Sequence, residues 1–259
     1  MGSMNRHLRA DNIAMARFII ALLLFFIGAL EAQAYDDWEL LTSSPERLIG
    51  ILDLPDIVQG GCGPAPHRST TRAFATPTQN GRSVGTIYWY EEPNVVCDLM
   101  IEKAGGEKEQ VPTLESGYEI PAAIVYERRG SWFRIRLATG SAWIRHDDET
   151  DFLPYPEFMR DQLSYVVHTW DGTLRTTPSV SGKVTPLTKG WQEVIARSPG
   201  IKFLGSRRVA GELWIQIELT TEERCGRERE LEGMTPVSGW IPAYDKNRTP
   251  LVWFSSRWC

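Results

Sequence analysis

The residues with the clearest chemical potential surround Cys62, which lies in the glycine-rich stretch Gly60–Pro64 with His67 five residues further on. A thiol near an imidazole is the arrangement of a cysteine nucleophile. His146 followed by Asp147 would supply a second partner of the same kind. The surrounding motif that cysteine hydrolases require is absent, so we interpret Cys62 as a structural cysteine and keep a thiol hydrolase as the alternative.

The chain contains four cysteines, Cys62, Cys97, Cys225 and Cys259. An even number in an exported chain favours disulfides, and four cysteines allow three connectivities. Two lie in each half of the chain, so we predict the pairs Cys62–Cys97 and Cys225–Cys259, each worth about 3–4 kcal/mol in the chain-entropy model. A zinc site is the remaining option, but C-x-x-C and paired-histidine spacings are missing. Neither a metal nor another cofactor is expected.

An acidic cluster follows His146 and consists of Asp147, Asp148, Glu149 and Asp151. Its oxygens are suitable ligands for calcium, but the spacing and the glycine of an EF-hand loop are absent. We interpret the cluster as part of an acidic linker. Paired carboxylates of a glycosidase are a further option, although nothing in the sequence singles out one pair. We therefore expect a protein that is not an enzyme.

The N-terminal 34 residues have the pattern of a secretory signal peptide. Arg6, Arg9 and Arg17 precede the apolar stretch Phe18–Leu30, and Ala32–Ala34 matches an A-x-A cleavage site. The apolar stretch would span roughly 20 Å as a helix, short of a hydrocarbon core of about 30 Å. We expect cleavage, a periplasmic or secreted protein and no transmembrane span afterwards; a retained anchor is the alternative.

Composition and charge narrow the possible functions. The chain has 259 residues, of which 24% are charged and 42% hydrophobic, the balance of a globular protein. Without the signal peptide the net charge is about −6, which argues against a nucleic-acid partner. The charge is uneven, at −8 for residues 35–160 and +2 for residues 161–259.

Short segments of alternating apolar and polar residues predict β-strands. In Ser131–Leu137, Trp132, Arg134 and Arg136 alternate with apolar residues, and Glu212–Leu219 has the same period of two. The best helix candidate, Glu157–Gln162, is short. An all-β fold follows.

The same order of segments occurs twice. The first copy contains Arg72–Pro77, Gly81–Ile87, Tyr126–Leu137 and Gly140–Ile144, and the second contains Gly172–Ser179, Ser181–Leu187, Leu204–Ile217 and Gly239–Ala243. This order resembles the bacterial SH3-like domain, in which a first strand ends near Pro-Ser/Thr and a closing strand contains Gly-Trp-Ile/Val. The resemblance implies two tandem small SH3-like β-barrels and covers about residues 70–148 and 163–245.

The resemblance suggests the domain boundaries. We expect a signal peptide at 1–34, a lead-in segment at 35–69 that adds a strand, a first domain at 70–150, a linker at 151–162 and a second domain at 163–259. Two departures from the pattern are a long insertion at about 90–117, which contains Cys97, and a long turn at 221–238, which contains Cys225. The predicted disulfides would hold these insertions.

The ten tryptophans are the best indication of function. Those at matching places in the two copies are Trp132, Trp143, Trp214 and Trp240. By analogy with the grooves of SH3-like domains that hold extended peptides, we expect Trp132, Trp214 and Tyr126 to contact a ligand. Trp143 and Trp240 are expected in the core.

The resemblance implies an exported, non-catalytic binding protein of the bacterial cell envelope. Its expected partner is a peptidoglycan peptide or an envelope protein. Two alternatives remain open: a secreted cell-wall hydrolase centred on Cys62 or Asp147, and an inhibitor or immunity-type protein that blocks a partner enzyme.

Overall fold

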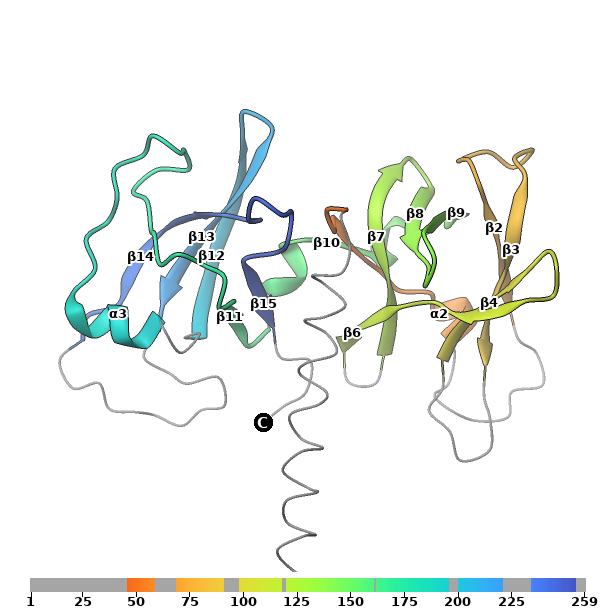
Figure 1. The fold of residues 1–259 in the computed structure, drawn as a ribbon, viewed down its shortest axis with the longest axis horizontal. Coiled ribbons are helices and arrows are strands. Elements are labelled where there is room, and N and C mark those ends of the chain that lie inside the picture. The colour runs from red at the N-terminus through yellow and green to blue at the C-terminus, as the bar shows by residue number, and fades with distance from the viewer. Residues whose placement is uncertain are drawn as a thin grey trace, which may run out of the picture. The chain divides into compact units, whose positions relative to one another are not determined.

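A computed structural model describes residues 46–58, 69–90, 98–117, 120–160, 162–195, 200–220 and 234–254. All of these belong to one compact unit of the chain, Pro45–Cys259. The expected signal peptide, all four cysteines and His67 lie outside the described residues. The described chain is mostly antiparallel β-structure in two curled sheets (Figure 1), which confirms the predicted all-β class. None of its helices is long and apolar enough to cross a membrane.

The first sheet has the strand order β10-β1-β7-β8-β9-β2-β3-β4-β5, and β6 pairs with β7. Its strands are β1 (Gly50–Leu52), β2 (Thr70–Phe74), β3 (Ser83–Tyr90), β4 (Asp98–Lys103), β5 (Lys108–Gln110), β6 (Thr113–Gly117), β7 (Ile120–Arg129), β8 (Trp132–Arg136), β9 (Ser141–Arg145) and β10 (Phe152–Pro154). The expected lead-in strand is β1, which pairs with both β7 and β10. The predicted insertion contributes β4, β5 and β6.

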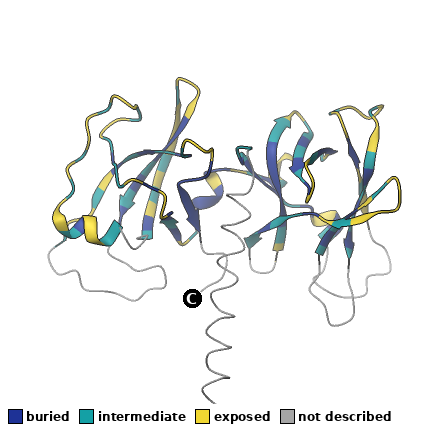
Figure 2. Cartoon of the chain, viewed as in Figure 1, coloured by how far each residue is buried: buried dark blue, intermediate teal, exposed yellow. Residues whose placement is uncertain are grey.

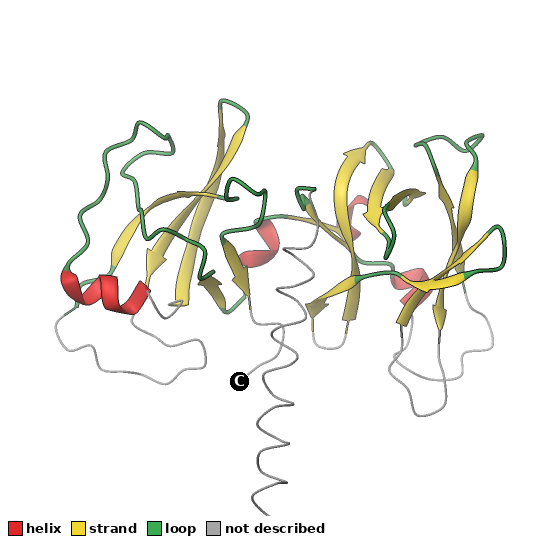
Figure 3. Ribbon diagram, in the orientation of Figure 1, coloured by secondary structure: helices red, strands yellow, loops and turns green. Residues whose placement is uncertain are grey.

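The second sheet has the order β14-β13-β12-β11-β15. Its strands are β11 (Ser164–Val166), β12 (Gly200–Val209), β13 (Glu212–Leu219), β14 (Val237–Pro242) and β15 (Val252–Phe254). The described helical segments, marked in Figure 3, are short: α2 (Pro55–Val58), η1 (Glu149–Asp151), η2 (Glu157–Met159) and α3 (Lys189–Ile195). The predicted helix at Glu157–Gln162 is only the single turn η2, whereas α3 was not predicted.

Alternation along the strands separates an apolar inner face from a polar outer face (Figure 2). In β8, Phe133 and Ile135 are fully buried, whereas the alternate residues Trp132, Arg134 and Arg136 are half-buried. The inner face of the first sheet joins side chains of eight strands and α2 into one core, which includes Ile87, Trp89, Leu99, Ile101, Phe133, Ile135 and Ile144. Burying a large apolar side chain is worth about 1.5–3 kcal/mol, so this core fixes which face each strand presents.

The two sequence copies form the same loop. In the first sheet, Thr78 N donates to Thr76 O at 2.8 Å and Gly81 N to Thr78 O at 3.0 Å. In the second sheet, the loop Thr177–Gly182 makes the corresponding bonds, 2.8 Å from Ser179 N to Thr177 O and 2.9 Å from Gly182 N to Ser179 O. The repeat found in the sequence therefore extends to backbone geometry.

The pairing of the closing strands also repeats. Trp143 lies opposite Arg134 and Phe74 in the first sheet. Trp240 lies opposite Gln216 and Arg175 in the second. Two positions before Arg134 and Gln216 in their strands lie Trp132 and Trp214, so the four matched tryptophans have equivalent registers.

The predicted linker at 151–162 is structured. Phe152–Pro154 forms β10, which pairs with β1, and Phe158 and Met159 of η2 are buried. The linker interpretation rested on prolines and acidic residues. The apolar residues between them are the physical reason for the difference, because burial outweighs the local preference for an open turn.

Two buried tyrosines join the segment around β1 and β10 to the second sheet. Tyr155 Oη donates to Ala243 O at 3.3 Å and to Val252 O at 3.0 Å, and Tyr244 Oη donates to Leu48 O. The two rings lie 5.3 Å apart. Burial raises the pKa of both hydroxyls above the ordinary value, because an anion would lose its hydration there.

Replacing Gly182 by Ala is expected to destabilise the protein by about 1–3 kcal/mol, as overpacking does. A Cβ at Gly182 would lie 2.6 Å from Thr177 Oγ1 and 2.8 Å from Thr177 O. Urea denaturation measures the loss. The matched control is Gly205→Ala, where no described atom lies within 4 Å of the added Cβ. Equal stability of the two variants would contradict the prediction.

The tyrosine pair predicts a loss of stability in alkali. Above about pH 10 the tyrosines of the unfolded chain ionise, while raised pKa values keep Tyr155 and Tyr244 protonated in the folded chain. Folding then retains protons that the unfolded state releases, so the free energy of unfolding decreases as pH rises. The variant Tyr155→Phe/Tyr244→Phe should lose about 1 kcal/mol or more at pH 7 and show a flatter alkaline decline.

Urea denaturation at a series of pH values checks this prediction. Tyr88→Phe serves as the control for a tyrosine outside the pair. If the double variant declined as steeply as the wild type, the buried hydroxyls would not be the cause of alkaline unfolding.

Candidate functional site

An arginine, a tryptophan and a second arginine lie side by side on the outer face of the neighbouring strands β7, β8 and β9. Trp132 of β8 is the cross-strand partner of Arg129 in β7 and of Arg145 in β9. Trp132 is half-buried, and the arginine side chains are 61% and 44% exposed. Directly opposed residues of antiparallel strands have Cβ atoms about 4.5–5.5 Å apart. The indole is therefore flanked on both sides by accessible guanidinium groups.

Aromatic rings of the next row support Trp132 from the same face. Phe74 of β2 contacts Trp132 edge to face, with centroids 5.5 Å apart. Trp143 of β9 is the cross-strand partner of Phe74, and the guanidinium of Arg129 lies 5.1 Å from its ring centre. Trp143 is only 5% exposed. It is buried as expected, but on the face opposite the core, beneath Arg129.

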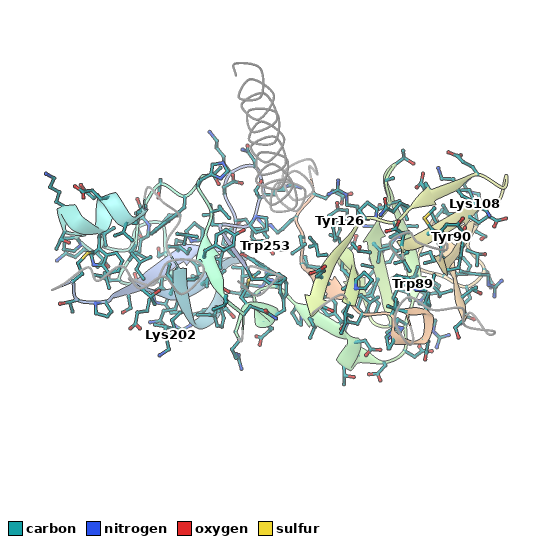
Figure 4. All side chains as sticks on the ribbon, turned by 90° about the horizontal axis from the view of Figure 1, so that it is seen from below. Trp89, Tyr90, Lys108, Tyr126, Lys202 and Trp253 are labelled. Atoms are coloured by element: carbon teal, nitrogen blue, oxygen red, sulfur yellow. The ribbon has the colours of Figure 1, made fainter. Side chains whose placement is uncertain are left out.

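Tyr126 adds to this surface through a β-bulge. The register of β7 with β8 shifts between Val125 and Glu127, so Tyr126 is the extra residue. The guanidinium of Arg134 lies 5.7 Å from the centre of its ring, and Figure 4 labels Tyr126 on β7. We call this surface the aromatic–arginine face; it consists of Phe74, Tyr126, Arg129, Trp132, Arg134, Trp143 and Arg145.

The arginines of the face differ in how firmly they are held. Arg134 donates to Glu46 at 2.8 Å, to Ser141 at 3.2 Å and to Glu127 at 3.2 Å, and is 21% exposed. Hydrogen bonds from Arg129 and then Arg134 lower the pKa of Glu127. Arg134 is therefore a fixed part of the scaffold.

The ion pairs of Arg129 and Arg145 involve more exposed guanidinium groups. Arg129 pairs with Glu127 at 2.6 Å, and Arg145 with Asp147 at 2.9 Å. Exposed ion pairs contribute about 0–1 kcal/mol. A carboxylate supplied by a ligand could therefore replace either acidic neighbour at little cost.

A polar cavity of about 500 Å³ adjoins the face at Arg145. It is lined by α2, the start of β2 and the segment after β9, and we call it the His146 cavity. His146 Nε2 and Asp151 Oδ2 lie 2.6 Å apart there, and both side chains are largely buried. Asp56, Asp147 and Asp148 also line the cavity, which makes it acidic.

Asp53, which directly precedes the residues of this cavity in the chain, carries a partly buried carboxylate. Its backbone N–H donates to Asp151 O at 2.9 Å, which brings the two acidic residues together. Burial raises the pKa of Asp53, the charge of Asp151 adds to the rise, and a hydrogen bond with Ser116 opposes it. Its Oδ1 is buried with no hydrogen-bond partner among the described residues.

The predicted acidic cluster separates into individual contacts. Arg128 pairs with Glu149 at 2.8 Å, and Asp148 accepts from Thr150 N at 2.9 Å as the cap of η1. The described residues include no group of three or more metal-ligating side chains. In this part of the chain, the cluster stabilises the end of the first sheet.

The expected ligand residues Trp132 and Tyr126 share one face, whereas Trp214 lies in the second sheet. Trp214 is only 3% exposed and lies between Arg207 and Pro242 in the register, and Tyr126 is only 9% exposed, so Trp132 is the one partly exposed residue of the three expected ligand residues. Trp240, which was expected in the core, is half-buried. Alternation assigned Trp214 to the outer face correctly but carries no information on what covers that face.

Sequence reasoning missed Arg129 and Arg145 as neighbours of Trp132. The turn at Gly130–Ser131 was a usable signal, because a two-residue hairpin turn makes Arg129 and Trp132 direct partners. Asp53 had no local signal, since its raised pKa depends first on burial by the folded chain, and Ser116 and Asp151 are remote in sequence.

The chain was compared with known proteins in three ways, and no protein-family model, curated protein or solved structure matches it.

Replacing Asp53 by Asn is expected to stabilise the protein at neutral pH. A raised pKa means that the folded state holds a proton more tightly than the unfolded state, so ionisation of Asp53 costs stability as pH rises. The gain of the variant should shrink on acidification and disappear near about pH 3, roughly one unit below the ordinary pKa of an aspartate, where the unfolded carboxyl is protonated as well. Urea denaturation across this range is the measurement, with Asp56→Asn as an exposed control. A variant less stable than the wild type at pH 7 would disprove the prediction.

Proposed function

We propose that the protein is an exported, non-catalytic binding protein of the bacterial cell envelope, built from two tandem SH3-like barrels. It holds a carboxylate-bearing peptidoglycan peptide on the aromatic–arginine face. The observation that carries this proposal is the placement of Trp132 between Arg129 and Arg145 on adjacent strands.

The chemistry of the face suits this class of ligand. Peptidoglycan peptides are short chains with free carboxylates. A planar indole provides apolar contact area, and a guanidinium group binds a carboxylate with two parallel hydrogen bonds. Arg129 and Arg145 could each bind one carboxylate while the peptide backbone crosses Trp132. Phe74 contacts the indole edge to face and keeps it in place, so little side-chain freedom is lost on binding.

The repeated architecture supports the SH3-like part of the proposal. The loops Thr76–Gly81 and Thr177–Gly182 have matching hydrogen bonds. The closing-strand tryptophans have matching registers in the two sheets. Export and disulfide formation rest on the N-terminal pattern and the cysteine count, and stay predictions.

One observation favours a second candidate function, a cell-wall hydrolase. The contact between His146 and Asp151 in the His146 cavity would orient an imidazole as a general base. The nucleophile that the sequence suggests for such an enzyme, Cys62, lies outside the described residues.

Replacing Trp132 by Ala should weaken binding to purified peptidoglycan at least tenfold, which corresponds to about 1.4 kcal/mol or more. Arg129→Ala/Arg145→Ala should weaken it similarly and reduce the dependence of binding on salt, because guanidinium–carboxylate attraction is screened by ions. Co-sedimentation with wall sacculi, followed by titration with soluble stem peptides, measures both effects.

The matched control is Arg160→Ala/Arg208→Ala, which removes two exposed arginines outside the strands of the first sheet and should bind normally. Release of soluble wall fragments that is lost in His146→Ala would favour the hydrolase. Wall binding that is unchanged in Trp132→Ala and in the double-arginine variant would reject the aromatic–arginine face as the site. If the protein did not bind walls but captured an envelope protein, the ligand would be that protein and not a peptidoglycan peptide.

A further inference from the structure

Strand β12 has an open edge over most of its length. Its residues pair with β13 throughout, but they pair with β11 only at Gly200 and Ile201. From Lys202 to Val209, the described residues include no backbone hydrogen-bond partner on the side away from β13. Alternate N–H and C=O groups of this segment therefore point towards solvent.

Most side chains along this edge are exposed. Lys202, Ser206, Arg207 and Arg208 are exposed, and Leu204 is 41% exposed although it is a large apolar residue. A Cβ built on Gly205 would meet nothing within 4 Å. Figure 2 shows exposed residues along the end of the β12–β13 hairpin, and Figure 4 shows Lys202 at the periphery of the second sheet.

The edge carries one sign of charge. Lys202, Arg207 and Arg208 form no ion pair among the described residues, and Arg208 donates only to Gly211 O, at 3.1 Å. This part of the chain is also the more basic one, with a net charge of +2 for residues 161–259. An acidic strand would therefore be attracted to this edge.

Charges and bulges on edge strands commonly prevent pairing with other chains. A bulge is present between Phe203 and Gly205, but the register is regular from Gly205 to Val209. Basic residues repel the same edge of a second copy. They give no such protection against an acidic strand, so the features that prevent self-association select a partner of opposite charge.

We propose that the open edge of β12, centred on Gly205–Val209, binds an extended acidic segment of a partner protein by β-strand addition. Backbone hydrogen bonds supply affinity. Arg207 and Arg208 lie on opposite faces of the strand, so the one on the same face as the acidic residues of the added segment selects them, and Leu204 contacts an apolar residue. This surface belongs to the second sheet, and its function is additional to peptide binding on the aromatic–arginine face of the first.

The experiment uses the mature, oxidised protein and a fluorescent synthetic peptide of alternating Glu and Val. Fluorescence anisotropy at low salt should show binding of this peptide but not of its Lys–Val counterpart. Methylation of alternate backbone nitrogens should abolish binding, because the added strand would lose its hydrogen-bond donors. Amide hydrogen exchange should slow at Gly205–Val209 when the peptide is bound.

Two double variants test the charge selection. Arg207→Glu/Arg208→Glu should bind the Glu–Val peptide about tenfold more weakly, a loss of about 1.4 kcal/mol. Lys183→Glu/Lys246→Glu makes the same change of charge at exposed positions of the second half and should bind nearly as the wild type does. Thermal unfolding verifies that both variants are folded, and Trp132→Ala should bind this peptide normally, which separates the result from the proposed function.

Several results would overturn the proposal. Equal binding of the methylated peptide would exclude strand addition, and equal weakening by the two double variants would exclude selection by Arg207 and Arg208. Protection of other amides would place the peptide elsewhere. Concentration-dependent dimerisation of the wild type, with Gly205–Val209 protected in the absence of peptide, would identify a second copy of this chain as the occupant.

Discussion

The aromatic–arginine face depends on the burial of Phe133 and Ile135 on the inner side of β8. A strand has two faces, so placing these apolar side chains in the core forces Trp132 and Arg134 to the opposite side. A shift of one residue in register would bury two arginines and expose the core, at a cost of several kcal/mol. Packing on the inner face of β8 thus fixes which side chains lie on its outer face.

Pairing between strands then brings residues that are separate in the sequence together on the aromatic–arginine face. Trp132 has Arg129 and Arg145 as direct neighbours because three strands form a meander with fixed register. The rings behind it give the indole a rigid support, while the exposed ion pairs of the two arginines remain weak enough to exchange for a ligand. Aromatic packing holds the indole of Trp132 rigidly, whereas the exposed guanidinium groups of Arg129 and Arg145 can adjust to a ligand.

The two sheets share one loop geometry and one closing-strand register but differ in their outer surfaces. The loops ending at Gly81 and Gly182 and the closing tryptophans correspond closely. In the second sheet, however, Trp214 is buried, and exposed basic side chains lie along the open edge of β12 instead. The two proposals therefore assign different partners to the two sheets, and the opposite net charges of the two halves of the sequence are consistent with them.

Residue types and their spacing alone determined the all-β class, the repeat and the outward placement of Trp132, because alternation and turn signals act over a few residues. The linker, the helix α3, the burial of Trp214 and the raised pKa of Asp53 could not be read in this way. Each depends on residues far apart in sequence: β10 on its pairing with β1, and the pKa of Asp53 on burial by the folded chain around it. Local patterns define the two faces of a strand, but only tertiary packing decides which face is covered, which charges meet and which edge stays open.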